Sequence, residues 1–519
     1  MFVKELKNKI TNFIIENKIF VILFILSTTY FIVEQFFNLS WDLSVFTLNA
    51  QYLFAESLYF EVGRPPLPSV IIGLYGMIFN WATAQVLYKI TVSTLFAFSI
   101  YKLAKTIKFN PAVLYALSLN VYVLLRGLSV GTELLSLSLL TLTVVMILKN
   151  NALSGIFLGL TALTRYTALA MFPFLIFHFK TNKIIKSLIL FSIVVGSWLL
   201  YNLFKFGNMF ESIANQYFLN VINRQYMVSP PNIIHFIEVF NVLTPFFLIG
   251  FIASIIILTK KTINVLKNKK KSRTKSFKKL FNENKTDIIM LLLTFYVTYN
   301  YLTTPLKISR YLFFLVLPGI YFSYKGLNNL LKKYGLQKYL LTSSLIILAI
   351  STLILSSFFI YFESADPYEK SIEVLDQFNL TNCYVESNVW PLISYLGKQA
   401  APSPRQSFVN ESIDDGKILL LFKTAREPEY ASDPEFINQF PVIYEDYSIY
   451  VVGKKDCKPE EPFHKSYAQQ FNEFIYKREG YEVNTNPCFL LFRNHELLEK
   501  TCNLLNLNGF TIDENRAIE

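Results

Sequence analysis

The sequence predicts an α-helical polytopic membrane domain of about 11 membrane helices at residues 1–361, followed by a small exterior α/β domain at residues 362–519. Two observations carry this prediction. The chain is 53% hydrophobic with a mean hydropathy of +0.37, which is typical of a polytopic membrane protein. Residues 1–361 hold 34 Lys and Arg against 11 Asp and Glu, whereas residues 362–519 hold 15 against 26. The basic excess therefore indicates the cytoplasmic loops of a membrane domain, and we expect no nucleic-acid partner.

The apolar runs give the positions of the membrane helices. About 20 apolar residues cross a bilayer as a helix. The runs that approach this length lie at residues 17–37, 83–101, 111–128, 133–148, 187–204, 233–259, 288–304, 311–325 and 339–361. Two shorter helices at 151–164 and 167–179 are expected to form a hairpin, and the short apolar segment 67–80 is expected to dip into the outer leaflet. The first run has no small-residue cleavage site after it, which indicates a retained span.

Lys and Arg clusters predict which loops face the cytoplasm. They gather in the N-terminal segment and around residues 102–108, 180–186, 260–285 and 325–338. With these five clusters inside, and with the short hairpin starting and ending inside, five segments face outside. They are the loop at 38–68, the turn before Glu133, the loop at 205–232, the turn at 305–310 and the C-terminal domain. We therefore expect a multi-pass protein of the cell (plasma) membrane, in contact with membrane lipid, with a cytoplasmic N-terminus and an extracytoplasmic C-terminal domain.

The first exterior loop, NLSWDLSVFTLNAQYLFAESLYFEVGRPPLP, combines acidic groups with an arginine. Asp42, Asn49 and Glu56 recur at every seventh residue, at the border of an apolar helical face. This pattern predicts a helix on the outer membrane surface with its apolar side in lipid, and Arg64-Pro65-Pro66 breaks it. Asp42 is either a functional carboxylate or the N-cap of this helix.

A second acid and a basic pair also lie at predicted outer ends of spans. Glu133 opens one span, where an acid costs free energy unless it is hydrated or paired. It is either a functional acid, or a local cap, or the partner of Arg126 at the end of the preceding span. Arg310 opens a later span one turn after Lys307. These two cations either clamp a phosphate or snorkel at the membrane interface. Carboxylates with Lys and Arg beside an aromatic-rich membrane groove suit a lipid-phosphate substrate whose head group reacts in water.

Four stretches resemble the GT-C superfamily of integral-membrane glycosyltransferases, and most of all the dolichyl-phosphate-mannose–protein mannosyltransferases and their aminoarabinose- and rhizobial-transferase-like relatives. They are the acid-bearing loop ending in GRPPLPS, then SVGTELL, GIFLGLTALTRYTALAMFP and ISRYLFFLVLPG. The resemblance covers residues 10–360. It implies a GT-C-like fold and the transfer of a hexosyl or pentosyl group from a polyprenyl- or dolichyl-phosphate carrier. The acceptor would be a protein, glycan or lipid at the exterior face, as in protein glycosylation or cell-envelope modification.

The same resemblance implies roles for individual residues. Asp42 would be the main catalytic acid, acting as a general base or in a metal site, and Glu133 would be the second acid. The carrier phosphate would be bound by Lys307 and Arg310, with Arg165 and Arg64 as further candidates. Acceptor or sugar binding would fall to Glu56, Asn49 and Tyr311. The cofactor is not identified; a divalent cation, Mg²⁺ or Mn²⁺, would have Asp42 and Glu133 as ligands, although no second acid directly neighbours Asp42.

Residues 362–519 alternate strand-like and helical patterns, which predicts a small α/β domain. Strands are expected at NCYVES, KILLLFK, FPVIYED, SIYVVG and CFLLF, and helices at PLISYLGK, FHKSYAQQFNEFIYKRE and NHELLEKTCNLLN. The domain holds four cysteines, Cys383, Cys457, Cys488 and Cys502. Disulfides and free buried thiols are equally expected for them. They form no CxxC pair, so a zinc site is not indicated. His464 and His495 are expected at the surface or in packing. We expect this domain to help bind the acceptor or to cover the active site.

Two other classes of function compete with the transferase. The alternative is a membrane transporter or a flippase for a lipid-linked substrate. Such proteins place ionisable groups and broken helices near the bilayer midplane, whereas the charges here cluster at outer span ends, with Arg165 as the main exception. A third interpretation is a noncatalytic receptor that acts through its exterior domain. The distribution of charges favours the transferase.

Overall fold

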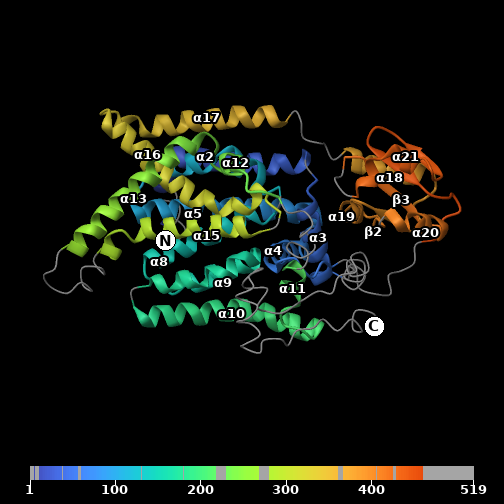
Figure 1. Cartoon of the computed structure of the whole chain (residues 1–519), viewed down its shortest axis with the longest axis horizontal. Coiled ribbons are helices and arrows are strands. Elements are labelled where there is room, and N and C mark those ends of the chain that lie inside the picture. Colours follow the sequence, from blue (N-terminus) through green and yellow to red (C-terminus); the bar gives the residue numbers. More distant parts are fainter. Residues whose placement is uncertain are drawn as a thin grey trace.

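The computed structural model describes residues 5, 11–37, 39–55, 60–129, 131–178, 180–217, 229–267, 280–304, 306–359, 366–404, 406–424 and 428–459. Within these ranges a bundle of long helices occupies one side of the molecule, and a small sheet domain lies beyond one end of it (Figure 1). The predicted combination of a helical membrane domain with a C-terminal α/β domain is therefore confirmed at this level.

The bundle contains helices of very different length. Its elements are α2 (Lys18–Phe37), α3 (Trp41–Phe54), α4 (Pro66–Gly76), α5 (Trp81–Ile107), α6 (Pro111–Ser118), α7 (Val121–Arg126), α8 (Glu133–Leu148), α9 (Ser154–Thr164), η1 (Tyr166–Phe177), α10 (Thr181–Phe206), α11 (Glu211–Tyr217), α12 (Ile233–Phe240), η4 (Asn241–Leu243), α13 (Thr244–Lys267), α15 (Lys285–Thr303), η5 (Ser309–Leu315), α16 (Val316–Lys333), η6 (Gln337–Tyr339) and α17 (Leu340–Phe359).

Among the described residues, five helical segments are long and apolar enough to cross a membrane: Lys18–Gln35, Trp81–Ile107, Thr181–Phe206, Ile233–Val265 and Gln337–Ser357. Five of the expected spans are therefore candidate membrane helices by length and composition, but eleven spans are not confirmed. The expected span at 111–128 is broken, because the Asn120 side chain caps a new helix by accepting from the amide of Val123 at 2.9 Å. The expected span at 311–325 begins instead as the 3-10 helix η5.

The helix that follows the first span is placed differently from the prediction. All residues of α3 from Leu43 to Ala50 are buried, so an apolar face in lipid is wrong. The reason is that α3 packs against α4 on one side and against α19 (Trp390–Tyr395) of the sheet domain on another. The double proline does not break α3, which already ends at Phe54. Pro66 instead starts α4, where a missing amide proton costs nothing.

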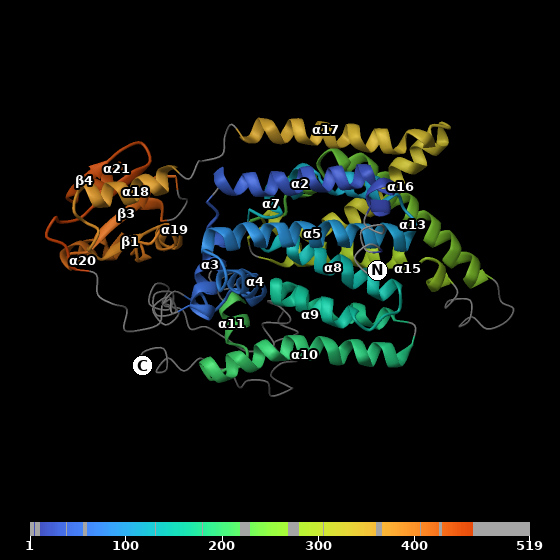
Figure 2. The same cartoon turned by 180° about the vertical axis from the view of Figure 1, so that it is seen from behind.

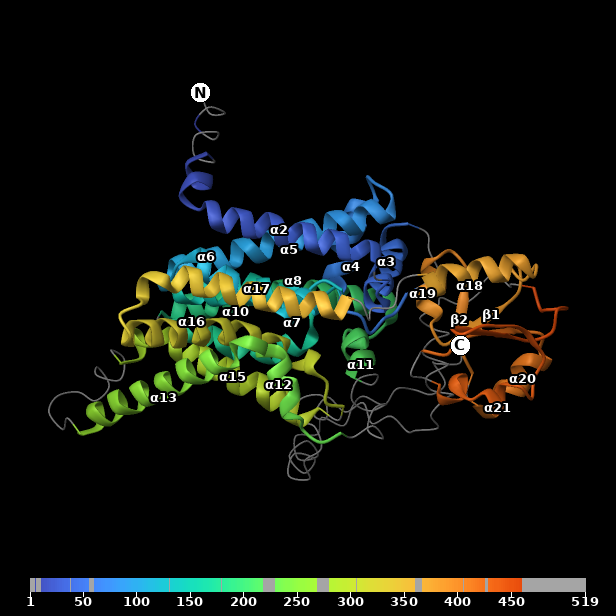
Figure 3. The same cartoon turned by 90° about the horizontal axis from the view of Figure 1, so that it is seen from above.

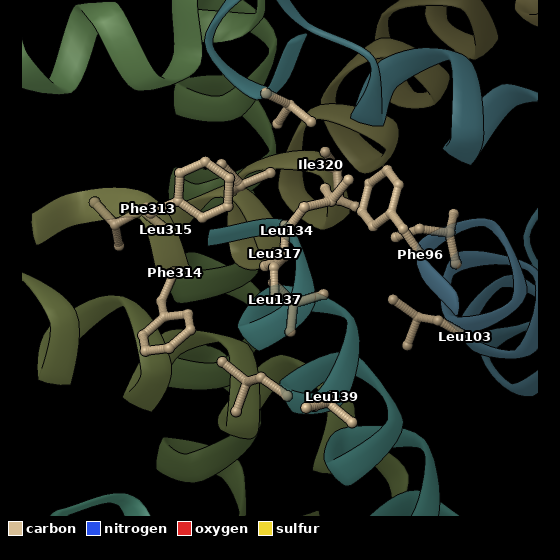
Figure 4. Packing of buried hydrophobic residues seen from close by; sticks show 14 of the residues in the cluster. Phe96, Leu103, Leu134, Leu137, Leu139, Phe313, Phe314, Leu315, Leu317 and Ile320 are labelled. Carbon is tan, nitrogen blue, oxygen red and sulfur yellow. The ribbon is translucent and has the colours of Figure 1, made fainter. Parts of the chain in front are cut away.

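The core of the bundle fixes the relative positions of α5, α8 and α16. Leu134, Leu137 and Leu139 of α8 point into a cluster that also holds Phe96 of α5 and Phe313 of η5 (Figure 4). Fourteen of the sixteen residues of α8 are buried, so this helix is surrounded by protein. Because Glu133 is the first residue of α8, the same packing places its carboxylate beside the start of η5.

The basic clusters and the acid-bearing loop lie at opposite ends of the bundle. The start of α2 and the turn between α16 and α17 lie far from α3 and the sheet domain (Figure 3). α3 itself lies at the end that faces the sheet domain, in the view from behind as well (Figure 2). This separation agrees with the charge pattern of the sequence; the assignment of the two ends to cytoplasm and exterior stays a prediction.

The C-terminal domain contains a five-stranded sheet in the order β2-β1-β3-β5-β4. β2, β1 and β3 are parallel, whereas β5 is antiparallel to β3 and to β4. The strands are β1 (Val385–Ser387), β2 (Ala400–Pro402), β3 (Ile418–Phe422), β4 (Val442–Glu445) and β5 (Ile449–Val452), with α18 (Asp366–Gln377), α19, α20 (Val409–Asp414) and α21 (Pro434–Ile437) and the 3-10 turns η7 (Gln406–Phe408) and η8 (Glu429–Ser432) around them.

Four of the five predicted strands and the predicted helix at PLISYLGK are present. Cys383 and Cys457 form a disulfide, which decides between the two alternatives for this pair. The predicted strand CFLLF, the last two predicted helices, Cys488, Cys502, His464 and His495 lie outside the described residues.

A test of the bundle packing uses two glycines where α13 and α16 touch. A methyl group at Gly250 would collide with the carbonyl oxygen of Phe322, and one at Gly326 with that of Phe246. Gly326→Ala should therefore destabilise the purified protein by about 1–3 kcal/mol, the usual range for overpacking. Gly196→Ala is the control, because nothing lies within 4 Å of a methyl group there. Thermal unfolding in detergent checks this, and equal melting temperatures for the two variants would contradict it.

Candidate functional site

Asp42 lies on the first turn of α3 and binds two arginines. The N-cap of this helix is Ser40, whose side chain accepts from the amide of Leu43, so the N-cap interpretation of Asp42 is wrong. Its Oδ2 accepts from Nη1 of Arg310 at 2.7 Å, and its Oδ1 accepts from Nη1 of Arg64. Both carboxylate oxygens are therefore engaged by guanidinium groups.

Glu133 binds arginines in the same way from the start of α8. Its Oε1 accepts from Nε of Arg310 at 2.5 Å and from Nη1 of Arg165 at 3.1 Å. Its Oε2 accepts from the hydroxyl of Thr132 at 2.9 Å. The carboxylate is fully buried. Its ion pairs are with these two arginines, so the local pair with Arg126 is wrong.

Arg310 is therefore the bridge between the two acids, which are far apart in the sequence. Its Nε reaches Glu133 while its Nη1 reaches Asp42. The planar fork of a guanidinium carries several donors at fixed angles, so it can hold two carboxylates at once, which an ammonium group does less well. The start of η5 thus binds the starts of α3 and α8 together.

A second arm of the site is formed by Arg64 and Glu61. Nε of Arg64 donates to Oε2 of Glu61 at 2.7 Å. The backbone of Glu61 is in turn held by Asn49, which donates from Nδ2 to its carbonyl at 3.0 Å and accepts from its amide at 2.8 Å. Asn49 therefore orients the arm that carries Arg64, and its amide group is used by the protein backbone.

The charges of this site balance, and the arginines are its most accessible part. Asp42, Glu61 and Glu133 face Arg64, Arg165 and Arg310. The side chain of Arg310 is 32% exposed and that of Arg64 is 24% exposed, whereas Glu133 is 0% exposed. An anion that approaches this end of the bundle therefore meets guanidinium groups before it meets the buried carboxylate.

The arginines set the protonation state of Asp42. Burial alone would raise the pKa of Asp42, but the adjacent guanidinium groups of Arg310 and Arg64 outweigh it and lower the pKa to about 2. In the same way, burial alone would lower the pKa of Arg310, and the carboxylates of Asp42 and Glu133 raise it above its usual value. Asp42 is therefore a carboxylate at every pH near neutrality, and its hydrogen bonds stabilise that charge.

The remaining candidates are placed less centrally. Lys307 is buried, its Nζ donates to the carbonyl of Thr304, and its amide donates to Ser229 at 2.7 Å. The structure thus brings Asp42, Glu133, Arg64, Arg165 and Arg310 into one network. Tyr311 follows Arg310 and is partly buried against the bundle core. Glu56 lies outside the described residues.

The sequence interpretation left two members of the network without a role. Glu61 is the partner of Arg64, and the three-residue spacing of this acid and base was the available signal. Thr132 donates to Glu133 from the adjacent position, where a hydroxyl gives little signal. Arg165 also lies over the ring of Phe314 at 5.6 Å, so an aromatic face supports its charge.

The arrangement does not fit a metal ion shared by Asp42 and Glu133. Arg310 binds both carboxylates directly, so its positive charge stands between them. Across the ranges that the structure describes, no three His, Cys, Asp or Glu side chains are grouped as metal ligands.

The fold is similar to that of ArnT from Cupriavidus metallidurans. Its crystal structure bound to undecaprenyl phosphate matches with a TM-score of 0.51 at 10% identity, over 85% of this chain and 99% of that chain. The crystal structure of the apo state matches with a TM-score of 0.52 at 9% identity over the same shares. No family model and no curated protein matches the sequence. At this identity the likeness shows the fold alone, and at that level it agrees with the resemblance expected from the sequence.

The buried carboxylate of Glu133 gives a stability prediction. Glu133→Gln should lower the free energy of unfolding by about 3 kcal/mol, because two guanidinium groups lose their shared counter-charge. Glu238→Gln, an exposed position on α12, is the control and should leave stability unchanged. Thermal unfolding of both purified variants checks this. A melting temperature of Glu133→Gln equal to that of the wild type would show that the pairing is not energetically significant.

Proposed function

We propose that this protein is a membrane glycosyltransferase that moves a sugar from a polyprenyl- or dolichyl-phosphate carrier to an acceptor. The observation that supports it is the convergence of Asp42 and Glu133 with three arginines at one end of the helical bundle. The similarity of the fold to ArnT, which has been crystallised with undecaprenyl phosphate, supports a polyprenyl-phosphate carrier. The reaction takes place at the exterior face of the plasma membrane, where mannose is one sugar that the resemblance suggests.

The carrier phosphate binds at the accessible arginines. Arg310 and Arg64 expose the largest fractions of their side chains among the groups of the network. A phosphate accepts two parallel hydrogen bonds from one guanidinium, so it competes for the donors that Asp42 now uses. Arg165 and Lys307 are further candidates for binding the phosphate. Arg165 lies close to Arg310 in space, and Lys307 precedes Arg310 by three residues in the chain.

Binding of the phosphate would release Asp42 for catalysis. In the free protein both oxygens of Asp42 are occupied, and its low pKa makes it a poor base. When the phosphate takes over the guanidinium donors, one oxygen of Asp42 becomes available and its pKa rises toward the ordinary value. The base is therefore activated only when the donor is in place.

The transfer step follows from these positions. Asp42 takes the proton of an acceptor hydroxyl, and the acceptor oxygen forms a bond to the anomeric carbon of the sugar. The bond from that carbon to the carrier phosphate oxygen breaks, and the phosphate leaves with its new charge neutralised by Arg310 and Arg64. Glu133 keeps its ion pairs when the phosphate binds, and it holds Arg310 and Arg165 in position. Tyr311, next to Arg310, is a sugar-binding candidate, and Asn49 positions Glu61 and Arg64.

A transporter or flippase is the second candidate, and one observation favours it. Glu34 of α2 and Lys89 of α5 form an ion pair at 3.5 Å with both side chains at most 5% exposed, inside two of the candidate membrane spans. Ionisable groups within a membrane often mark a pathway for a substrate or ion. Movement of a lipid-linked sugar across proteoliposomes without sugar transfer would support this function instead.

The first activity prediction concerns Asp42. Asp42→Asn should reduce sugar transfer at least 1,000-fold, because an amide cannot accept the proton of the acceptor. Asp287→Asn is the matched control: Asp287 pairs with Lys325, near the other end of the bundle, and should not affect transfer. Purified variants are incubated with radiolabelled polyprenyl-phosphate sugars and a membrane extract as acceptor source. Transfer by Asp42→Asn at the wild-type rate would remove the proposed base.

The second activity prediction concerns pH. The ratio kcat/KM reports the free protein, in which the pKa of Asp42 is about 2, so it should not fall between pH 7 and pH 4 through this group. By contrast kcat reports the complex, in which the arginines are engaged by phosphate and the pKa is higher. An acid limb should therefore occur at higher pH in kcat than in kcat/KM. The same limb in both parameters would contradict the exchange.

A further inference from the structure

The sheet domain is in direct contact with the helix that carries Asp42. Trp390, the first residue of α19, meets Trp41 edge to face with ring centroids 4.9 Å apart. Val45 and Leu48 of α3 are buried in a cluster with Trp41, Trp390 and Tyr395. α19 therefore covers one complete stripe of α3, from the residue beside Asp42 to a point two turns further on.

α3 is held between this contact and the charged network. Trp41, Val45 and Leu48 are spaced by four and three residues, which places them on one helical face. Asp42 and Asn49, seven residues apart, share the neighbouring face, where they bind Arg310 and the backbone of Glu61. A shift of α3 relative to α19 would thus move Asp42 relative to its arginines.

α19 is itself fixed to the sheet. It starts three residues after β1, which lies between β2 and β3 in the parallel part of the sheet. Asn388, in that connection, donates to the carbonyl of Phe422 at 3.0 Å and accepts from its amide at 2.9 Å, which joins the ends of β1 and β3. The disulfide between Cys383 and Cys457 secures the segment that leads into β1.

A polar contact joins the same elements. Tyr395, at the end of α19, interacts with Gln85 of α5. Nε2 of Gln85 donates to the hydroxyl of Thr47 on α3 at 2.7 Å, and Oε1 of Gln85 accepts from Gln35 of α2 at 2.6 Å. Gln85 therefore connects α19, α3, α5 and α2, and the sheet domain is tied to the bundle at both ends of α19.

We propose that the C-terminal domain is part of the catalytic unit: α19 positions α3, and through it Asp42, with Trp390 as the positioning residue. This rests on the proposed glycosyltransferase function. Trp390 need not touch the substrate, because its effect passes through Trp41 to the adjacent carboxylate. A displacement of a catalytic group by about 1 Å can reduce a rate by about 100-fold, so loss of this contact should be evident in kcat.

The test compares Trp390→Ala with Trp390→Phe in the full-length purified protein. Trp390→Ala should lower kcat at least tenfold with the KM for the carrier sugar within twofold of wild type, and Trp390→Phe should restore kcat because a ring fills the contact. Tyr447→Ala, 80% exposed in the turn between β4 and β5, is the matched control in the same domain. The fluorescence of the three remaining tryptophans should shift to longer wavelength in Trp390→Ala only, because water reaches Trp41.

Tyr395→Ala, at the other end of α19, replaces Trp390→Ala if that variant does not give folded protein.

The outcomes of this test separate the positioning role from the glycosyltransferase function. Normal kcat in the variant, with active wild type, overturns the positioning role and leaves the glycosyltransferase function intact. A fall in kcat without a fluorescence shift, or one that Trp390→Phe does not restore, also overturns it. A wild type that transfers no sugar from any polyprenyl-phosphate donor overturns the function and the positioning role together.

Discussion

The rest of the site depends on the two-sided ion pair of Arg310. One guanidinium holds Asp42 at the start of α3 and the buried Glu133 at the start of α8, across sequence separations of 268 and 177 residues. Burying carboxylates costs free energy unless cations and hydrogen bonds compensate, and Arg310 supplies this compensation to both acids where α3 and α8 begin. Arg64 and Arg165 complete the compensation from the other sides. The outcome is a neutral, preorganised cluster whose accessible part is cationic.

This cluster explains why the same residues can serve both the fold and the proposed chemistry. In the free protein the ion pairs hold Asp42 unreactive, and a phosphate is the kind of ligand that competes for the same donors. Under the proposed function, activation of Asp42 as the base is coupled to binding of the sugar donor, which limits reaction with other molecules. The contact of α19 with α3 also constrains the position of Asp42, because Asp42 and Trp41 are consecutive residues on a helix that is held from two sides.

Much of the fold and part of the site could be predicted from the sequence. The long apolar runs indicated α2, α5, α10, α13 and α17, because lipid requires length and apolar composition. An amphipathic pattern cannot distinguish lipid from protein as the partner of an apolar face. The prediction that α3 lies on the membrane surface was therefore wrong. Asp42, Glu133 and Arg310 could be selected as charges at span ends. Their pairing could not, because it depends on how α8 and η5 pack, and neither Arg310 nor Arg165 is near Glu133 in the chain.

The most direct measurement of the central claim is the affinity of the detergent-purified protein for a polyprenyl phosphate without sugar, for wild type and Asp42→Asn. Competition between Asp42 and the phosphate for Arg310 and Arg64 predicts that Asp42→Asn, although inactive in transfer, binds the carrier phosphate more tightly. Arg310→Lys should bind it more weakly in the same experiment, because the two-donor fork is lost. Equal or weaker binding by Asp42→Asn would contradict the exchange of the arginines between Asp42 and the substrate.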